Sequence, residues 1–182
     1  MFLRGHQAMS EPRIRPAGAA DIPSITRIYA DAVREGTGTF EIEPPDEAEM
    51  GRRHEALLGD NFPYLVVEYA GAVAGYTYAG RYHVRPGYQW TLENSVYVAP
   101  RFQRLGLGRL LMRRLLAEAE TRGYRQMLAL IGDQGNVASI ALHASLGFRR
   151  IGTLQSVGFK HGRWLDVVVM QRPLGGANSL PP

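Results

Sequence analysis

The feature that most constrains this chain is a strand-like segment that enters a helix through a loop with two glycines. Residues 96–98 are apolar, and an amphipathic helix is expected from residue 106. The N–H groups of a first helical turn have no partner within the helix, and glycine lets a bulky anion approach them. Arg104 and Arg109 flank this turn and can donate charge-assisted hydrogen bonds to phosphate oxygens. The pattern predicts a pyrophosphate site, unless Gly106 and Gly108 only permit tight packing.

Two other kinds of phosphate-binding loop can be excluded. A P-loop needs Lys followed by Ser or Thr after its second glycine, and no such pair occurs in the chain. A dinucleotide fold has glycines at the first, third and sixth positions of the turn together with repeated βαβ units, and the chain has neither. The loop therefore indicates neither a nucleoside triphosphate nor NAD.

Length points to one domain. A chain of 182 residues can bury a substantial core but is short for two ordinary domains. We assign residues 13–174 to this domain and expect residues 1–12 and 175–182 to be flexible extensions. No apolar run approaches the ~20 residues that span a bilayer, and the first residues lack the long apolar centre of a signal peptide. A cytoplasmic protein with no membrane partner is expected.

Residue usage excludes several kinds of chemistry. A disulfide framework, a thiolate metal site and a cysteinyl acyl-enzyme all need a thiol, and the chain has no cysteine. The net charge of +4 arises from an excess of arginine, with Lys160 as the single lysine. Because this excess is modest and scattered, we expect no nucleic-acid partner.

Hydrophobic periodicity predicts an α/β order of elements. Helices are expected from a cap at Asp21 to residue 35, from Asp46 to residue 58, and over residues 106–122 and 136–146. Strands are expected at residues 13–16, 64–69, 72–79, 90–98, 126–131, 148–154 and 164–170. Because helices and strands do not alternate regularly, the sheet should be mixed rather than a βαβ repeat.

Three ordered motifs resemble the GNAT family of acetyltransferases. Residues 103–108 (Gln-Arg-Leu-Gly-Leu-Gly) match the family signature Gln/Arg-x-x-Gly-x-Gly/Ala, Asn136 starts a helix that contains His143, and residues 146–148 (Leu-Gly-Phe) follow that helix. The order of elements over residues 13–172 resembles the whole family fold. The resemblance implies a single-domain GNAT fold, with a mixed, mostly antiparallel sheet of about seven strands splayed in the middle and about four flanking helices. It also implies acetyl-CoA as co-substrate and no metal.

Within the family, the chain is most similar to phosphinothricin and methionine sulfone/sulfoximine N-acetyltransferases. Residues 90–98 (Trp-Thr-Leu-Glu-Asn-Ser-Val-Tyr-Val), 129–132 (Ala-Leu-Ile-Gly) and 158–166 (Gly-Phe-Lys-His-Gly-Arg-Trp-Leu-Asp) carry this resemblance, with His143. It implies acetylation of the primary amine of a small amino-acid-like substrate by direct transfer in a ternary complex. The alternatives are another amine or a protein N-terminus as acceptor, or an acyl-CoA-binding protein without catalysis.

Glu93 is the candidate general base. Attack on a thioester needs a neutral amine, whereas amino-acid ammonium groups are largely protonated at neutral pH. Glu93 lies in an otherwise apolar or neutral strand, where burial would raise its proton affinity. The alternative is a solvated carboxylate at a strand edge.

The resemblance assigns acetyl-CoA to the glycine loop and its neighbours. The side chains of Val96 and Val98 should be core, while the N–H of Val98 can polarise the thioester carbonyl. Asn136 is either a helix cap or a contact of the pantetheine arm. His143 stands where many GNAT enzymes carry a tyrosine that protonates the leaving thiolate, so proton donor, substrate contact and packed core histidine all stay open. The expected cofactor residues are Val96, Tyr97, Val98, Gln103, Arg104, Leu105, Gly106, Leu107, Gly108, Arg109, Asn136 and Ser139.

The acceptor amine is expected beside a basic loop that precedes the Glu93 strand. Arginine and histidine there favour an anionic substrate over a polyamine, although solvated side chains are the alternative for each. Phe40 can wall this pocket, and a homodimer is expected by analogy with the family. The expected substrate residues are Phe40, Arg81, His83, Arg85, Tyr88, Asn94 and Ser95.

Overall fold

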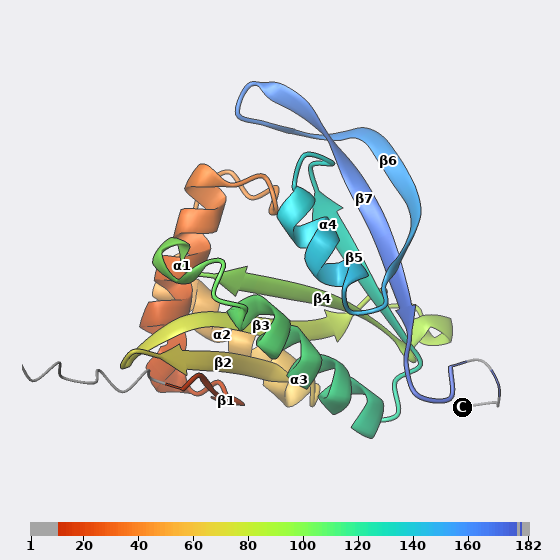
Figure 1. Ribbon diagram of the computed structural model, residues 1–182, viewed down its shortest axis with the longest axis horizontal. Coiled ribbons are helices and arrows are strands. Elements are labelled where there is room, and N and C mark those ends of the chain that lie inside the picture. The colour runs from red at the N-terminus through yellow and green to blue at the C-terminus, as the bar shows by residue number, and fades with distance from the viewer. Residues whose placement is uncertain (1–10, 178, 180–182) are drawn as a thin grey trace, which may run out of the picture.

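The computed structural model describes residues 11–177 and 179. These residues are built around one mixed sheet (Figure 1). Every neighbouring pair of strands is antiparallel except β4 and β5, which run parallel. The seven strands of these residues follow the order β1 (Arg13–Pro16), β2 (Tyr64–Tyr69), β3 (Ala72–Arg81), β4 (Thr91–Val98), β5 (Gln126–Gly132), β7 (Arg163–Pro173) and β6 (Arg149–Lys160). The predicted α/β class and strand number are confirmed.

Four α-helices cover the two faces of this sheet within the described residues. Helices α1 (Ile22–Glu35) and α2 (Glu47–Gly59) pack on one face, where buried residues of α1 meet Tyr64, Val66 and Tyr76. Helices α3 (Leu107–Thr121) and α4 (Val137–Ala144) lie on the other face, with α3 in front of the sheet in Figure 1. This two-faced arrangement follows from strand alternation, because neighbouring residues of β2 and β3 point to opposite helical layers.

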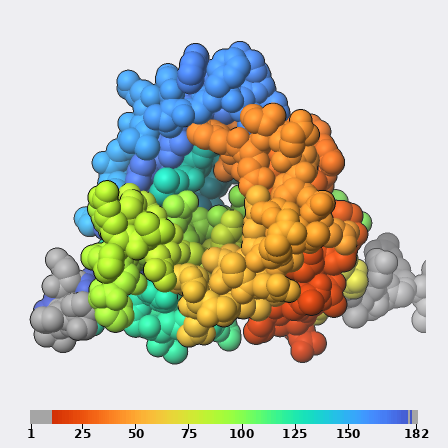
Figure 2. Space-filling view, turned by 180° about the vertical axis from the view of Figure 1, so that it is seen from behind, coloured from red at the N-terminus to blue at the C-terminus, as the bar shows by residue number. Residues whose placement is uncertain are grey.

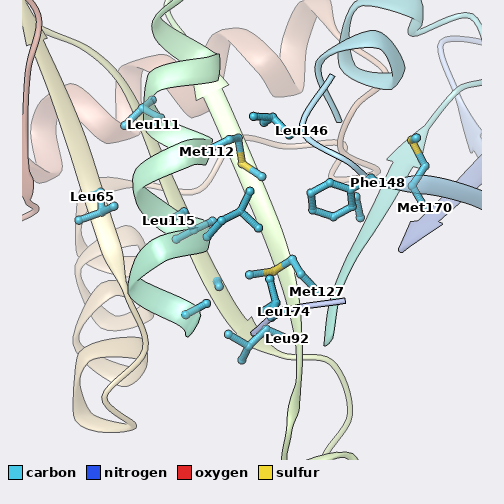
Figure 3. Close-up of a cluster of buried hydrophobic side chains, with 14 of the residues drawn as sticks. Leu65, Leu92, Leu111, Met112, Leu115, Met127, Leu146, Phe148, Met170 and Leu174 are labelled. Carbon is cyan, nitrogen blue, oxygen red and sulfur yellow. The ribbon is translucent and has the colours of Figure 1, made fainter. Parts of the chain in front are cut away.

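Helix α3 carries the larger part of the core. Its apolar side chains Leu111, Met112 and Leu115 are fully buried and face Leu65 and Met127 of the sheet (Figure 3). They recur at the spacing of one helical face, as an amphipathic helix requires. Burying a large aliphatic side chain contributes roughly 1.5–3 kcal/mol, so this helix and the glycine loop before it are firmly attached to the sheet.

One of the two predicted helix caps is confirmed, and the other is wrong. Asp46 caps α2 as expected, because its Oδ1 accepts a hydrogen bond of 2.8 Å from the N–H of Glu49. Asp21 stands at the N-cap position of α1, but its carboxylate does not cap that helix, so this prediction is wrong. The carboxylate accepts two hydrogen bonds from Arg15, at 2.7 and 2.8 Å, and one from the N–H of Gly18. Arg15 holds the pKa of this buried carboxyl below its usual value.

The C-terminal hairpin is longer than the sequence pattern predicts. β6 was expected to end at residue 154 and β7 at residue 170, yet they reach Lys160 and Pro173. The pairing register of β6 shifts between Leu154 and Gly158, and most of this strand faces outward. An exposed, bulged edge strand has no alternating hydrophobic pattern, so its length could not be predicted from periodicity.

The expected extensions at residues 1–12 and 175–182 fall mostly outside the described residues, so that prediction is not tested. Within residues 11–177 and 179, none of the helices is both long enough and apolar enough to cross a membrane.

Candidate active site

The central pair of strands separates soon after it forms. β4 pairs with β5 only where residues 91–93 lie beside residues 126–128. Beyond Glu93, β4 pairs with β3 alone, and the rest of β5 pairs with β7 alone. The sheet is therefore splayed in its middle, as the sequence resemblance implied.

A cleft of about 740 Å³ lies at this splay. Leu105 is the one predicted cofactor residue that does not line it, and its side chain is 51% exposed. Of the other predicted residues, Asn94, Ser95 and His143 also contribute to the lining. The predicted cofactor residues in the lining are Val96, Tyr97, Val98, Gln103, Arg104, Gly106, Leu107, Gly108, Arg109, Asn136 and Ser139.

The glycine loop presents backbone N–H groups to this cleft. Gly106 is the N-cap of α3 with φ +79°, and Arg104 before it has φ +63°, so both lie in the left-handed region. The first hydrogen bonds back to the Gly106 carbonyl come from Arg109 and Leu110, at 3.1 Å each. The preceding N–H groups of the helix start are free for an anion, which the helix dipole also favours. A Cβ at Gly108 would lie 3.4 Å from the Leu142 side chain, so packing here is tight.

The backbone of β4 turns one edge toward the cleft. The N–H of Ala99 donates to the Ala74 carbonyl at 2.9 Å, so Ala99 faces β3. Because N–H directions alternate along a strand, the N–H of Val98 faces away from β3 and toward the splay. The side chain of Gln103 donates to the Val98 carbonyl at 3.4 Å, which agrees with this direction. The side chains of Val96 and Val98 are half-buried against the core, as predicted.

Glu93 stands at the point where β4 and β5 separate. It is the last β4 residue paired with β5, opposite Leu128. Its side chain is half-buried, and burial raises the pKa of its carboxyl above the usual range. Within the described residues, no protein group donates a hydrogen bond to this carboxylate. A half-buried carboxylate with a raised pKa and free lone pairs is suited to accept a proton.

Asn94, the next residue, is buried on the opposite face of β4. Its Nδ2 donates to the Leu128 carbonyl of β5 at 2.8 Å, and its Oδ1 lies 3.0 Å from Nε2 of His143. The Asn94 side chain therefore spans the two strands where their backbone pairing stops. Both ring nitrogens of His143 are occupied, since Nδ1 lies 2.8 Å from the Ser139 carbonyl.

His143 is a packed histidine whose two ring nitrogens both face oxygen acceptors. It is 3% exposed, and its ring lies edge-on to Phe148 at 5.0 Å. A neutral imidazole can donate to only one of the two oxygens. Burial nevertheless lowers its pKa, and the hydrogen bond to the Ser139 carbonyl opposes this only in part. The neutral ring is thus favoured near neutral pH, and the hydroxyl of Ser139, 3.4 Å from Nδ1, can donate to that nitrogen when Nε2 carries the proton.

Asn136 is both the cap of α4 and a residue of the cleft wall. Its Oδ1 accepts a hydrogen bond of 3.2 Å from the N–H of Ser139, which is the N-cap arrangement. The same residue lines the cleft beside Gly38. The Asn136 side chain therefore caps α4, and its amide group lies at the wall of the cleft.

The predicted acceptor residues of the β3–β4 loop are exposed and lie outside the cleft lining. Arg81 lies 3.8 Å from the carboxylate of Asp60, and the ring of His83 packs against that of Tyr88 at 5.1 Å. Nδ1 of His83 accepts a hydrogen bond from the N–H of Arg85. Figure 2 shows a hollow that is bordered by this loop, by the loop after α1 and by the β6–β7 hairpin.

Phe40 follows α1 and packs against glycines of β5 and β6. Its Cε1 is 3.1 Å from the position of a Cβ on Gly132, and its ring covers Gly158 of β6. On β5, Gly132 and Leu128 share one face, and the pairing with Leu128 puts the Glu93 side chain on this face as well. Phe40 and Glu93 therefore occupy the same face of the sheet.

Several tyrosines near Glu93 were not predicted as site residues. Tyr78 lies opposite Ser95 on β3 and therefore on the face of Glu93, and burial raises the pKa of its hydroxyl. Tyr29 of α1 shares a hydrogen bond of 2.9 Å with Thr39, and burial raises its pKa to about 12. The spacing of Tyr76 and Tyr78, two residues apart in one strand, was the available signal for a shared aromatic face.

Two further observations concern a second groove and possible metal ligands. A second groove, of about 960 Å³, runs beside β1, the β2–β3 turn and α1, and none of the predicted site residues lines it. Among the described residues, no cluster of His, Asp and Glu has the arrangement of a metal site.

Comparison with known proteins adds independent information. The family model "Acetyltransferase (GNAT) family" matches residues 25–148. A phosphinothricin N-acetyltransferase from Alcaligenes faecalis is 49% identical over 162 residues, which cover 89% of this chain and 82% of the relative. An L-methionine sulfoximine/L-methionine sulfone acetyltransferase from Pseudomonas paraeruginosa is 40% identical over 169 residues, covering 92% and 98%.

A solved structure shows the same arrangement. The crystal structure of a phosphinothricin acetyltransferase from Sinorhizobium meliloti in complex with AcCoA has a TM-score of 0.91 and 42% identity, and covers 94% of this chain and 92% of its own. Three findings indicate the same family: a family model that spans most of the described domain, relatives above 40% identity, and a shared fold. The chain therefore belongs to the GNAT family of acetyltransferases.

Proposed function

We propose that this protein is an acetyl-CoA-dependent N-acetyltransferase for the primary amine of small amino-acid-like substrates of the phosphinothricin and methionine sulfoximine or sulfone type. The substrate class is that of relatives at 40–49% identity that match nearly the whole chain. One structural observation carries the proposal. Glu93, with its raised pKa, is the last residue paired across the splay, and it immediately precedes Asn94 and Ser95, which line the same cleft as the glycine loop, although Glu93 itself does not.

The residues around the cleft fit acetyl-CoA. The N–H groups at the start of α3, with Arg104 and Arg109, provide donors for a pyrophosphate. Bound acetyl-CoA supplies the acetyl thioester. The N–H of Val98, which faces the splay, provides a donor for the oxygen that gains negative charge during acyl transfer.

Glu93 accepts the proton that the acceptor ammonium must lose before its nitrogen can attack. Transfer is direct, within a complex of both substrates, since the chain has no cysteine for a cysteinyl acyl-enzyme. Asn94 and His143 act from the other face of β4 by holding the two strands at the splay, so we place them in positioning roles. The exposed loop with Arg81, His83, Arg85 and Tyr88 borders the acceptor side and supplies its positive charge.

The proposal includes a homodimer that buries the outer surface of the C-terminal hairpin. Ile151, Leu154, Val157, Phe159 and Trp164 expose between 48% and 65% of their surface along β6 and the start of β7. β6 is also an edge strand with unpaired backbone groups. A second copy would cover both the apolar side chains and this edge.

The test is thiol release from acetyl-CoA with a panel of acceptors: methionine sulfone, methionine sulfoximine, phosphinothricin, spermidine and a peptide amine. Turnover on the first three supports the substrate class. Turnover on spermidine or the peptide alone refutes it and leaves an acetyltransferase for another acceptor. Tight binding of acetyl-CoA without turnover on any amine would indicate a non-catalytic acyl-CoA-binding protein.

A further inference from the structure

Residues 36–41, here called the strap, cross from the end of α1 to the half of the sheet formed by β5, β7 and β6. In Figure 1 this segment runs from the top of α1 toward α4 and the end of β5. The two halves of the sheet pair directly only over residues 91–93 and 126–128. The strap therefore links them a second time, at the open end of the splay.

The strap is attached to the α1–α2 side by polar contacts. The hydroxyl of Tyr29 and Oγ1 of Thr39 are 2.9 Å apart, and the N–H of Glu41 donates to the same oxygen at 3.3 Å. The Glu41 carboxylate pairs with Arg53 of α2 at 2.6 Å. One side of the strap thus has two anchors on the helical layer, Tyr29 of α1 and Arg53 of α2.

On the hairpin side, one ammonium group makes the main polar contact. Nζ of Lys160, at the end of β6, donates to the Thr39 carbonyl at 2.8 Å, and Lys160 is 3% exposed. The neighbouring His161 is exposed and lies 3.2 Å from the Gly36 carbonyl. Within the described residues, Lys160 forms no ion pair with a carboxylate. A buried ammonium whose hydrogen bond goes to one backbone carbonyl is costly, and the negative charge of Glu41 offsets this cost only in part, which argues for a role other than stability alone.

Glycines let the strap pack closely against the sheet. A Cβ on Gly158, two residues before Lys160, would overlap the Phe40 ring, and a Cβ on Gly132 would overlap the Thr37 carbonyl. Lys160 and Gly158 thus hold two consecutive strap residues, Thr39 by its carbonyl and Phe40 by its ring. Phe40 lies on the face of Glu93, whereas the start of the strap lines the cofactor cleft.

We propose that Lys160 is a positioning residue for acetyl transfer, which pins Thr39 and thereby keeps Phe40 as the far wall of the acceptor pocket. This inference rests on the proposed function. Loss of the ammonium should free the Thr39 carbonyl and let the Phe40 ring move off Gly158. Acceptor binding should weaken, while the glycine loop and the bond-making groups at Glu93 and Val98 stay in place.

The test compares Lys160→Met with Arg150→Met, a cation on the same strand whose side chain is exposed and donates a hydrogen bond to Thr153. Steady-state kinetics are measured with whichever panel amine the wild type turns over. A hydrogen bond from a charged group corresponds to about a tenfold or larger change in an equilibrium, so KM for the acceptor should rise about tenfold in Lys160→Met. KM for acetyl-CoA and kcat should change less, and Arg150→Met should match the wild type.

Gly158→Ala provides a second route to the same displacement, because its Cβ would push the Phe40 ring away and leave Lys160 intact. It should also raise KM for the acceptor, and it tests whether the placement of Phe40 controls acceptor binding. Lys160→Gln replaces Lys160→Met if that variant does not fold. The inference is overturned if the Lys160 variant keeps the wild-type KM for the acceptor, whatever Gly158→Ala does, or if it lowers kcat and thermal stability without that change. An inactive wild type would instead refute the proposed function.

Discussion

Nε2 of His143 lies 3.0 Å from Oδ1 of Asn94, and this contact joins α4 to the point where β4 and β5 separate. His143→Gln should lower the free energy of unfolding by about 1–3 kcal/mol, because it leaves buried polar atoms unpaired. Its kcat should fall by less than the roughly 10²–10⁴-fold that a general acid contributes. Urea unfolding and steady-state kinetics check both values. A large loss of kcat at unchanged stability would assign proton donation to His143.

Glu93→Gln should lower kcat/KM by about 10²–10⁴-fold if Glu93 is the base. The folded-state pKa of Glu93 is raised by burial, so its ionisation at neutral pH disfavours the folded state. The variant should therefore be at least as stable as the wild type at pH 7, and this advantage should fade as pH falls through the folded-state pKa and be gone below about 4.5, where the unfolded carboxyl is also protonated. Melting curves at several pH values, beside thiol-release assays, measure the two effects. Unchanged turnover would remove Glu93 from the mechanism.

Gly108→Val should raise KM for acetyl-CoA by more than about tenfold, since a branched side chain would stand in the cleft and against Leu142. Gly123→Ala is the matched control, because Gly123 lies outside the cleft lining. Its Cβ meets open space, but φ is +84°, so the expected cost is about 1 kcal/mol of stability. Equal effects of the two variants on KM for acetyl-CoA would contradict a phosphate-binding role for this turn.

Asp21→Asn should lower the free energy of unfolding by about 3 kcal/mol at pH 7, because it leaves part of the Arg15 guanidinium uncompensated. Arg15 depresses the folded-state pKa of Asp21, so its contribution is present above the unfolded value near 3.8 and is lost as pH falls through the folded value. The difference between wild type and variant should thus shrink in strong acid. Urea titrations at pH 7 and at successively lower pH follow it, and a difference that is independent of pH would argue against the ion pair.

Ile151→Asp should shift the protein from dimer to monomer, because it puts a charge into the proposed apolar contact. Gln155→Asp, on the same exposed strand but replacing a polar side chain, should leave the dimer intact. Sedimentation velocity over a range of concentrations distinguishes these outcomes. A wild-type monomer at all concentrations would refute the dimer outright.

The sequence predicts local elements well and long-range contacts poorly. β1 and β2 have the expected bounds, and β2 is a short, largely apolar run that ends at a turn. Asp21 was misread because its partner Arg15 becomes a neighbour only after β1 joins the sheet. The hydrogen bond from Asn94 to Leu128 forms where β4 and β5 separate, and the hydrophobic periodicity of the sequence does not show where they separate. The strap contacts join residues 121 positions apart, a separation over which a hydrophobic pattern carries no information.

The burial of Lys160 also has a practical consequence, because it is the only lysine in the chain. Lysine-directed reagents such as activated esters should react slowly with this side chain in the native protein. Burial lowers the pKa of Lys160, but the covering strap keeps reagents from the amine. Once the strap or the whole domain opens, one lysine per molecule becomes reactive. The rate of modification at Lys160, separated by peptide mapping from that of the α-amino group, would report the opening of the native state without an engineered probe.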